Sequence, residues 1–128
     1  MNIISSLSNF DNNWVMPYRM PDGKTYVSLT DTPNMLKIDP ETLKPEGLIK
    51  WEDDLMSTTG TTHVKTLPNG DLVGVVAEIS MKGENLLTAY RIKGDNIYKR
   101  IRIASINTGS CSIYQHSFGL SEDYVTIF

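Results

Sequence analysis

The sequence predicts an all-β protein of antiparallel strands, and three observations lead to that fold class. Runs rich in Val, Ile, Thr, Tyr and Leu recur along the chain, and several of them alternate. Turn sequences containing Asn-Gly or Asp-Gly separate the runs and supply the positive φ values that tight hairpins need. No helical pattern of convincing length interrupts this series.

The expected strands follow one another in an order set by the turns between them. A Pro-Asp-Gly turn at 21–23 precedes the first run, and a Pro-Asn-Gly turn at 68–70 separates the third from the fourth. Lys-Gly-Asp-Asn at 93–96 and Ser-Glu-Asp at 121–123 divide the later runs. The expected strands cover residues 25–29, 35–38, 61–66, 71–79, 86–92, 98–103, 112–118 and 124–128.

The two histidines of the chain, His63 and His116, each open a similar segment. In both segments a leucine follows four residues later, and a polar turn and a β-type run come next. Four short antiparallel strands in about 50 residues is the spacing of a β-propeller blade. The pattern therefore predicts about two blades of an incomplete propeller, although a sandwich of eight strands fits nearly as well.

The length of 128 residues suits one domain with a real core. The chain stops at Phe128, inside an apolar run with no turn after it. A strand cut at this point lacks the partner that would take up its hydrogen bonds. We therefore expect residues 1–128 to be part of a larger domain, and the chain to be a fragment.

The charge pattern argues against a nucleic-acid surface. The net charge is −3, and no block of like charges occurs, whereas nucleic acids are bound by clustered Lys and Arg. The most basic stretch, residues 99–102 (Lys-Arg-Ile-Arg), alternates like a solvated strand face. Asp53 and Asp54 are expected to be solvated as well.

The single cysteine, Cys111, cannot form an internal disulfide, which favours a reducing, cytoplasmic location. We expect its side chain to be a small core residue. The longest apolar run, residues 72–77, is far shorter than the about 20 residues of a spanning helix. Any membrane contact is expected to be peripheral and to come from regions outside this chain.

Three side chains are candidates for chemistry. Neutral imidazole binds first-row transition metals, and a propeller gathers its inner strands around an axis, so His63 and His116 could share one metal ion. Asp31, at the end of a strand, could accept the spare N–H of a metal-bound imidazole. The residues alone leave open that both histidines are ordinary strand residues and that Asp31 starts a turn.

Three segments resemble the carotenoid cleavage oxygenases, the family that includes the retinal pigment epithelium isomerohydrolase and the β-carotene oxygenases. Residues 114–124 resemble its His-Ser-Phe-Gly-Leu-Thr segment, and residues 30–43 resemble its Thr-Glu-Thr segment followed by Ile-Asn/Asp-Pro-Glu-Thr-Leu. Residues 60–63 (Gly-Thr-Thr-His) resemble the segment that bears its first iron-binding histidine. The matches occur in the family's order and together span about residues 26–128.

The resemblance implies a seven-bladed propeller with a non-haem Fe(II) ion held on its axis by four histidines. His63 would match the first ligand and His116 the second, and Asp31 would match a glutamate that orients a ligand imidazole. The family cleaves a double bond of a carotenoid, apocarotenoid or stilbene with O₂, and one branch isomerises retinyl esters. The implied partners are therefore a lipophilic polyene and O₂.

Two departures from the family pattern affect this site. Valine follows His63 where the family usually has proline, and Asp31 replaces glutamate. The shorter arm loses one C–C bond, roughly 1.5 Å, so a bridging water or a lost contact is expected.

No histidine follows His116, so we expect the polypeptide alone neither to assemble the iron centre nor to turn over substrate. Two alternatives to the enzyme stay open. One is a non-catalytic β-propeller or β-sandwich interaction module in which both histidines are structural. The other is a natural short form that does not fold by itself.

Overall fold

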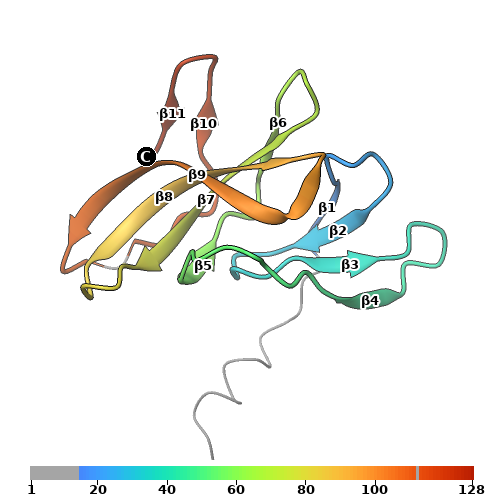
Figure 1. Cartoon of the computed structure of the whole chain (residues 1–128), viewed down its shortest axis with the longest axis horizontal. Coiled ribbons are helices and arrows are strands. Elements are labelled where there is room, and N and C mark those ends of the chain that lie inside the picture. Colours follow the sequence, from blue (N-terminus) through green and yellow to red (C-terminus); the bar gives the residue numbers. More distant parts are fainter. Residues whose placement is uncertain (1–14, 112) are drawn as a thin grey trace, which may run out of the picture.

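The computed structural model describes residues 15–111 and 113–128. The regular elements within these residues are all β-strands (Figure 1). The paired strands of the described residues are all antiparallel. The strands form a four-stranded sheet, a five-stranded sheet and a two-stranded hairpin. The expected all-β class with antiparallel strands is confirmed.

The first sheet has the order β1-β2-β3-β4. Its strands are β1 (Met16–Arg19), β2 (Tyr26–Leu29), β3 (Leu36–Ile38) and β4 (Pro45–Leu48). The two buried strands, β2 and β3, were expected from the sequence. The outer strands β1 and β4 were not, because both are mostly exposed and contain proline, which sheets tolerate at their edges.

The second sheet has the order β5-β7-β8-β9, and β6 also pairs with β7. Its strands are β5 (Ser57–Gly60), β6 (Lys65–Thr66), β7 (Leu72–Ile79), β8 (Asn85–Lys93) and β9 (Asn96–Gly109). One strand over residues 61–66 was wrong: residues 61–64 lie between β5 and β6. The Thr61 N–H still donates to the Val75 carbonyl at 3.0 Å, but the Val75 N–H donates to the Thr61 hydroxyl at 3.2 Å, so a side chain replaces one of the two backbone partners of a regular ladder.

The C-terminal segment forms a hairpin of β10 (Gly119–Leu120) and β11 (Val125–Thr126). The strand expected over 112–118 was wrong for residues 113–118, and residue 112 lies outside the described residues. This segment is held by side-chain packing, because Phe118 is buried and Ile113 packs with it against β7 and β8. The strand expected over 124–128 shortens to β11.

The second sheet has a hydrophobic core on each face. Alternate residues of β7 divide between the cores: Leu72 and Val76 face the first sheet, and Val73, Val75 and Ala77 face the C-terminal segment. A strand buried on both faces is apolar at successive positions, which explains the run at 72–77. The second sheet is therefore the central layer of the described chain.

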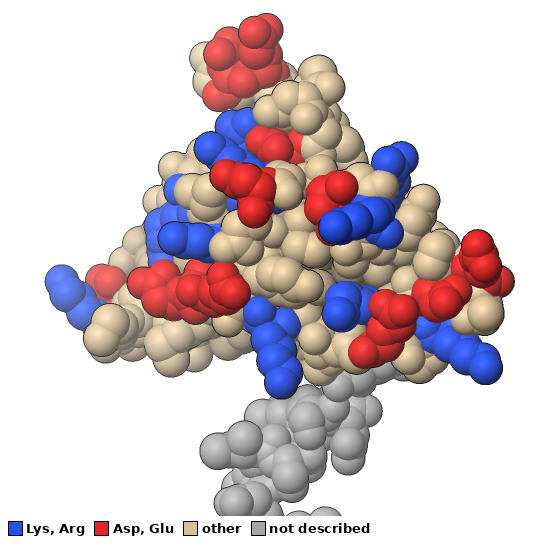
Figure 2. Space-filling model, turned by 45° about the vertical axis from the view of Figure 1, so that its right-hand side comes forward, with Lys and Arg blue, Asp and Glu red and all other residues tan. Residues whose placement is uncertain are grey.

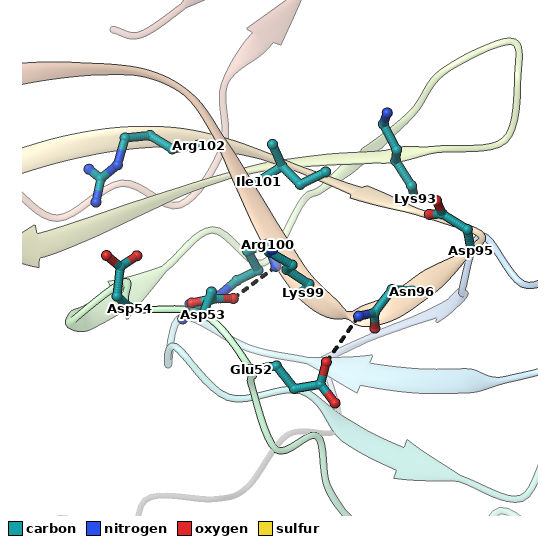
Figure 3. Close-up of a pocket in the computed structure, with 10 residues that line it drawn as sticks. All are labelled: Glu52, Asp53, Asp54, Lys93, Asp95, Asn96, Lys99, Arg100, Ile101 and Arg102. Carbon is teal, nitrogen blue, oxygen red and sulfur yellow. Dashed lines mark hydrogen bonds and ion pairs between the residues drawn. The ribbon is translucent and has the colours of Figure 1, made fainter.

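Asp53 and Arg100 form a buried ion pair, so the expectation that both are solvated was wrong. Each side chain is only 3% exposed. The carboxylate of Asp53 accepts hydrogen bonds from Nη2 of Arg100 at 2.7 Å and from Nε at 3.0 Å, and Figure 3 shows Asp53, in the loop before β5, beside Arg100 of β9. Residues 99–102 alternate as a surface strand does, but the guanidinium of Arg100 points into the protein.

The stability of the fold is expected to fall in acid through Asp53. Burial raises the pKa of its carboxyl, but hydrogen bonds from the Arg100 side chain and backbone, the Arg100 charge and the Leu55 N–H outweigh burial and lower it. Because the folded pKa is depressed, the stabilisation is complete above the unfolded value of about 3.9 and is lost as the pH falls through the folded value. Urea unfolding of wild type and Asp53→Asn between about pH 7 and about pH 3 measures this contribution. The difference in the free energy of unfolding between the two proteins should be constant near neutral pH and should become smaller at the acid end. A difference that stays constant down to about pH 3 would contradict the lowered pKa of Asp53 as the cause.

The charged side chains of the described residues are mixed on the face drawn in Figure 2, where Lys and Arg alternate with Asp and Glu. This distribution agrees with the absence of like-charge blocks in the sequence. Cys111, by contrast, is exposed, so its expected place in the core was wrong. No helix in the described residues is long and apolar enough to cross a membrane.

Candidate functional site

His63 and His116 lie side by side although they are far apart in the sequence. Their ring centroids are 4.8 Å apart, and the ring planes meet at 80°. His63 belongs to the segment between β5 and β6, and His116 to the segment that leads into β10. The N–H of His63 donates to the backbone carbonyl of His116 at 3.4 Å, which joins the two segments directly.

Asp31 contacts His116 directly. Nδ1 of the ring lies 2.8 Å from Oδ1 and 3.0 Å from Oδ2 of the carboxylate. The expectation that the shorter aspartate would need a bridging water or lose the contact was therefore wrong. The backbone of residues 31 and 32 lies close to Gly60, at the end of the strand that precedes the His63 segment.

Gly60 allows this close approach of the backbone. Its N–H donates to the Asp31 carbonyl at 3.2 Å, and a Cβ at this position would lie 2.8 Å from the Thr32 carbonyl oxygen. Real Cβ atoms essentially never come so near a backbone oxygen. On the other side of the loop, the Trp51 indole N–H donates to the Pro33 carbonyl at 3.4 Å.

Two further residues hold the Asp31 carboxylate, and sequence reasoning missed both. The Thr62 hydroxyl donates to Oδ1 and the Tyr114 hydroxyl donates to Oδ2. Both stand in the segments that resemble the family, Thr62 next to His63 and Tyr114 two residues before His116. This nearness to the histidines is the one sequence signal that could have indicated them.

These contacts set the charge state of the carboxylate. Burial raises the pKa of Asp31, but hydrogen bonds donated by Thr62, Tyr114 and His116 outweigh burial and lower it below its ordinary value. The same hydrogen bond to Asp31 raises the pKa of the Tyr114 hydroxyl, so Tyr114 stays protonated as a donor. An ionised carboxylate only accepts, so Nδ1 of His116 carries a proton and donates it to Asp31, which in the neutral ring leaves the lone pair on Nε2.

The donor set fits part of a site for a first-row transition metal. Nε2 of His116 could bind a metal ion as an imidazole ligand. The ring nitrogens of His63 make no hydrogen bond to the described residues. Within residues 15–111 and 113–128, however, no three His, Cys, Asp or Glu side chains are grouped to hold a metal ion. His63 and His116 could thus supply two ligands, with Asp31 occupied in holding one of them.

An open cleft of the described residues lies away from these three side chains. Its volume is about 810 Å³, and it runs between the loop at residues 52–54 and the β8–β9 turn with the first half of β9 (Figure 3). Acidic and basic side chains line it together, and none of the three candidate site residues contributes to it. The candidate chemistry is therefore not in this cleft.

Comparison with known proteins identifies a family. The model of the family described as retinal pigment epithelial membrane protein matches residues 7–128. The carotenoid isomerooxygenase of Drosophila melanogaster is 26% identical over 94% of this chain and 20% of its own length. The carotenoid isomerooxygenase of Galleria mellonella is 28% identical over 91% of the chain and 23% of its own length. The chain thus spans about a fifth of the length of these relatives.

Proposed function

The chain belongs to the retinal pigment epithelial membrane protein family, and from this premise we propose that it is part of an iron-dependent carotenoid oxygenase. The parent enzyme would cleave a double bond of a carotenoid-like polyene with O₂. The observation that carries the proposal is the convergence of His63 and His116, whose rings lie 4.8 Å apart, with Asp31 on Nδ1 of His116. Two relatives named carotenoid isomerooxygenase support a carotenoid as the substrate class.

We propose that the two larger sheets are neighbouring blades of a seven-bladed propeller. In each sheet, the strands lie beside one another in nearly their order along the chain, as in a propeller blade. The hairpin β10–β11 would then begin a third blade, and residues 1–128 would form part of a larger propeller domain. In this arrangement, both histidine segments lead into or join the innermost strands, near the axis.

His63 and His116 would each donate one imidazole nitrogen to the metal, and two further histidines would come from other blades of the parent. When bound, an Fe(II) ion with this ligand set supplies the site with a centre that activates O₂. The contribution of this chain is geometric: Asp31 holds the Nδ1 proton of His116, so that Nε2 is presented in one orientation. Which bond of the polyene is cleaved would then follow from how the substrate is positioned next to the metal.

Replacing either His63 or His116 with alanine in the full-length parent is expected to remove most of the bound iron and to lower polyene cleavage by at least about 100-fold. The reason is that each substitution deletes a metal ligand and not merely an orienting contact. Iron is measured by elemental analysis and cleavage by loss of polyene absorbance. Glu122→Ala, an exposed change in the turn between β10 and β11, is the matched control and should leave both unchanged.

Unchanged iron content and activity in both histidine variants would refute the proposed metal site. That outcome would favour a non-catalytic interaction module in which the two histidines only join segments of the fold. The position of further histidines in the parent separates the same two functions, because a structural pair requires none near the propeller axis.

A further inference from the structure

We propose that Tyr114 and Thr62 are positioning residues of the candidate site, and that their hydroxyls hold the Asp31 carboxylate against His116 and thereby select one tautomer of its ring. The structural part of this inference stands on the contacts alone. Its consequence for metal binding rests on the proposed function. Neither residue needs to touch a metal or a substrate for this role.

The contacts engage both oxygens of the carboxylate, although the Asp31 side chain is 26% exposed. Oδ1 accepts from the Thr62 hydroxyl and from Nδ1 of His116, while Oδ2 accepts from the Tyr114 hydroxyl and also lies 3.0 Å from the same Nδ1. The two hydroxyls therefore bind different oxygens of one carboxylate. They prevent the group from rotating about its terminal bond, which is otherwise a soft torsion.

The three groups come from different parts of the chain, which makes the arrangement a tertiary feature. Asp31 lies in the loop after β2, Thr62 follows β5, and Tyr114 precedes β10. Thr62 is completely buried, so packing fixes the position of its hydroxyl. Tyr114 is 64% exposed, and among the described residues its hydroxyl donates to Asp31 alone.

This difference in burial separates positioning from stability. An exposed tyrosine contributes little to the core, so removing its hydroxyl should leave the folded state intact. The same removal frees Oδ2 of Asp31, and the carboxylate can then turn away from Nδ1. A purely structural role for Tyr114 would change the unfolding midpoint and leave the His116 tautomer as it was.

The short arm of Asp31 limits how its carboxylate can face the ring. Aspartate has a single methylene, so the loop backbone must lie close for the carboxylate to reach Nδ1 of His116. Two donors on its remaining lone pairs select the one rotamer in which it accepts from His116.

The test is to measure the ring nitrogens of His116 by long-range ¹H–¹⁵N correlation in the 128-residue chain, which contains only two histidines. Wild type should show Nδ1 protonated and Nε2 unprotonated, with one tautomer dominant. Tyr114→Phe and Thr62→Val should each give a mixture of tautomers. Tyr124→Phe, which removes a hydroxyl from another exposed tyrosine, should behave as wild type. Asp31→Asn serves as the positive control for a lost carboxylate.

Affinity for Co²⁺, followed by its absorption spectrum, gives a second readout in the full-length parent. We expect a loss of about tenfold for Tyr114→Phe, the effect typical of groups that orient a ligand histidine. An unchanged tautomer in both Tyr114→Phe and Thr62→Val would overturn the inference, as would an unfolding midpoint that falls with the tautomer unaltered. If the His116 tautomer changes in these variants while the wild-type parent binds no Co²⁺, the positioning role is upheld and the proposed metal site is refuted.

Discussion

Removing the side chain of Arg100 is expected to lower the free energy of unfolding by about 3–5 kcal/mol, because it leaves the Asp53 carboxylate buried without its partner. The Arg100 guanidinium makes several polar contacts. It donates to both oxygens of Asp53, to the Ser57 hydroxyl at 2.6 Å and to the Leu55 carbonyl at 3.0 Å. It also lies 4.6 Å from the centre of the Trp51 ring, which adds a cation–π contact.

The two halves of this ion pair should be strongly coupled. Arg100→Met and Asp53→Leu should each be severely destabilising alone, whereas the double variant should lose much less than their sum, since no uncompensated charge stays buried. The Leu55 carbonyl keeps the Ser57 N–H as a donor at 2.9 Å, so the double variant leaves it satisfied. Urea unfolding of the four proteins gives the coupling energy.

Lys99→Met is the matched control for Arg100→Met. Lys99 precedes Arg100 on β9 but is exposed, and a substitution there should change the free energy of unfolding by less than about 0.5 kcal/mol. Equal effects of the two Met substitutions would mean that the ion pair does not hold the loop at residues 52–54 onto β9.

Gly74→Ala is expected to destabilise the protein by about 1–3 kcal/mol through overpacking. Gly74 lies in β7 directly opposite Tyr90 of β8, and the tyrosine ring covers it. A Cβ on residue 74 would approach Cε1 of Tyr90 to 2.9 Å and Cζ and Oη more closely. Because Tyr90 is itself buried in the core between the two larger sheets, its ring has no free space to move into.

Gly119→Ala provides a comparison at a strand glycine that has room. The nearest atom to a Cβ at residue 119 would be Cβ of Thr126 at 3.4 Å, an ordinary contact. Alanine should therefore be neutral or stabilise by up to about 1 kcal/mol, since it reduces the entropy of the unfolded chain. In thermal or urea unfolding, alanine should lower the free energy of unfolding at position 74 and should leave it unchanged or raise it at position 119.

The double variant Gly74→Ala with Tyr90→Leu identifies the cause of the loss at position 74. A smaller residue at position 90 removes the collision, so alanine should cost much less in that background than in wild type. An equal cost in both backgrounds would mean that Tyr90 is not the residue that requires glycine.

The sequence alone determined the β-class and the most buried strands. Residues 71–79 and 86–92 were expected as strands and correspond to β7 and β8, because apolar runs and turn residues are local signals. The motifs around Asp31, His63 and His116 also indicated which residues to place together, since each motif is contained in a few consecutive positions. The short edge strands β1 and β4 gave no such signal.

Only the tertiary structure decided which polar groups meet. The break at residues 61–64, the hydroxyls of Thr62 and Tyr114 on Asp31, and the exposure of Cys111 all depend on segments distant in the chain. Asp53 and Arg100 are 47 positions apart, so no local pattern shows that one will neutralise the other. Hydrophobic periodicity reports which face of a strand is buried, but the partner of a buried charge is set by how the sheets pack, and packing is a property of the whole fold.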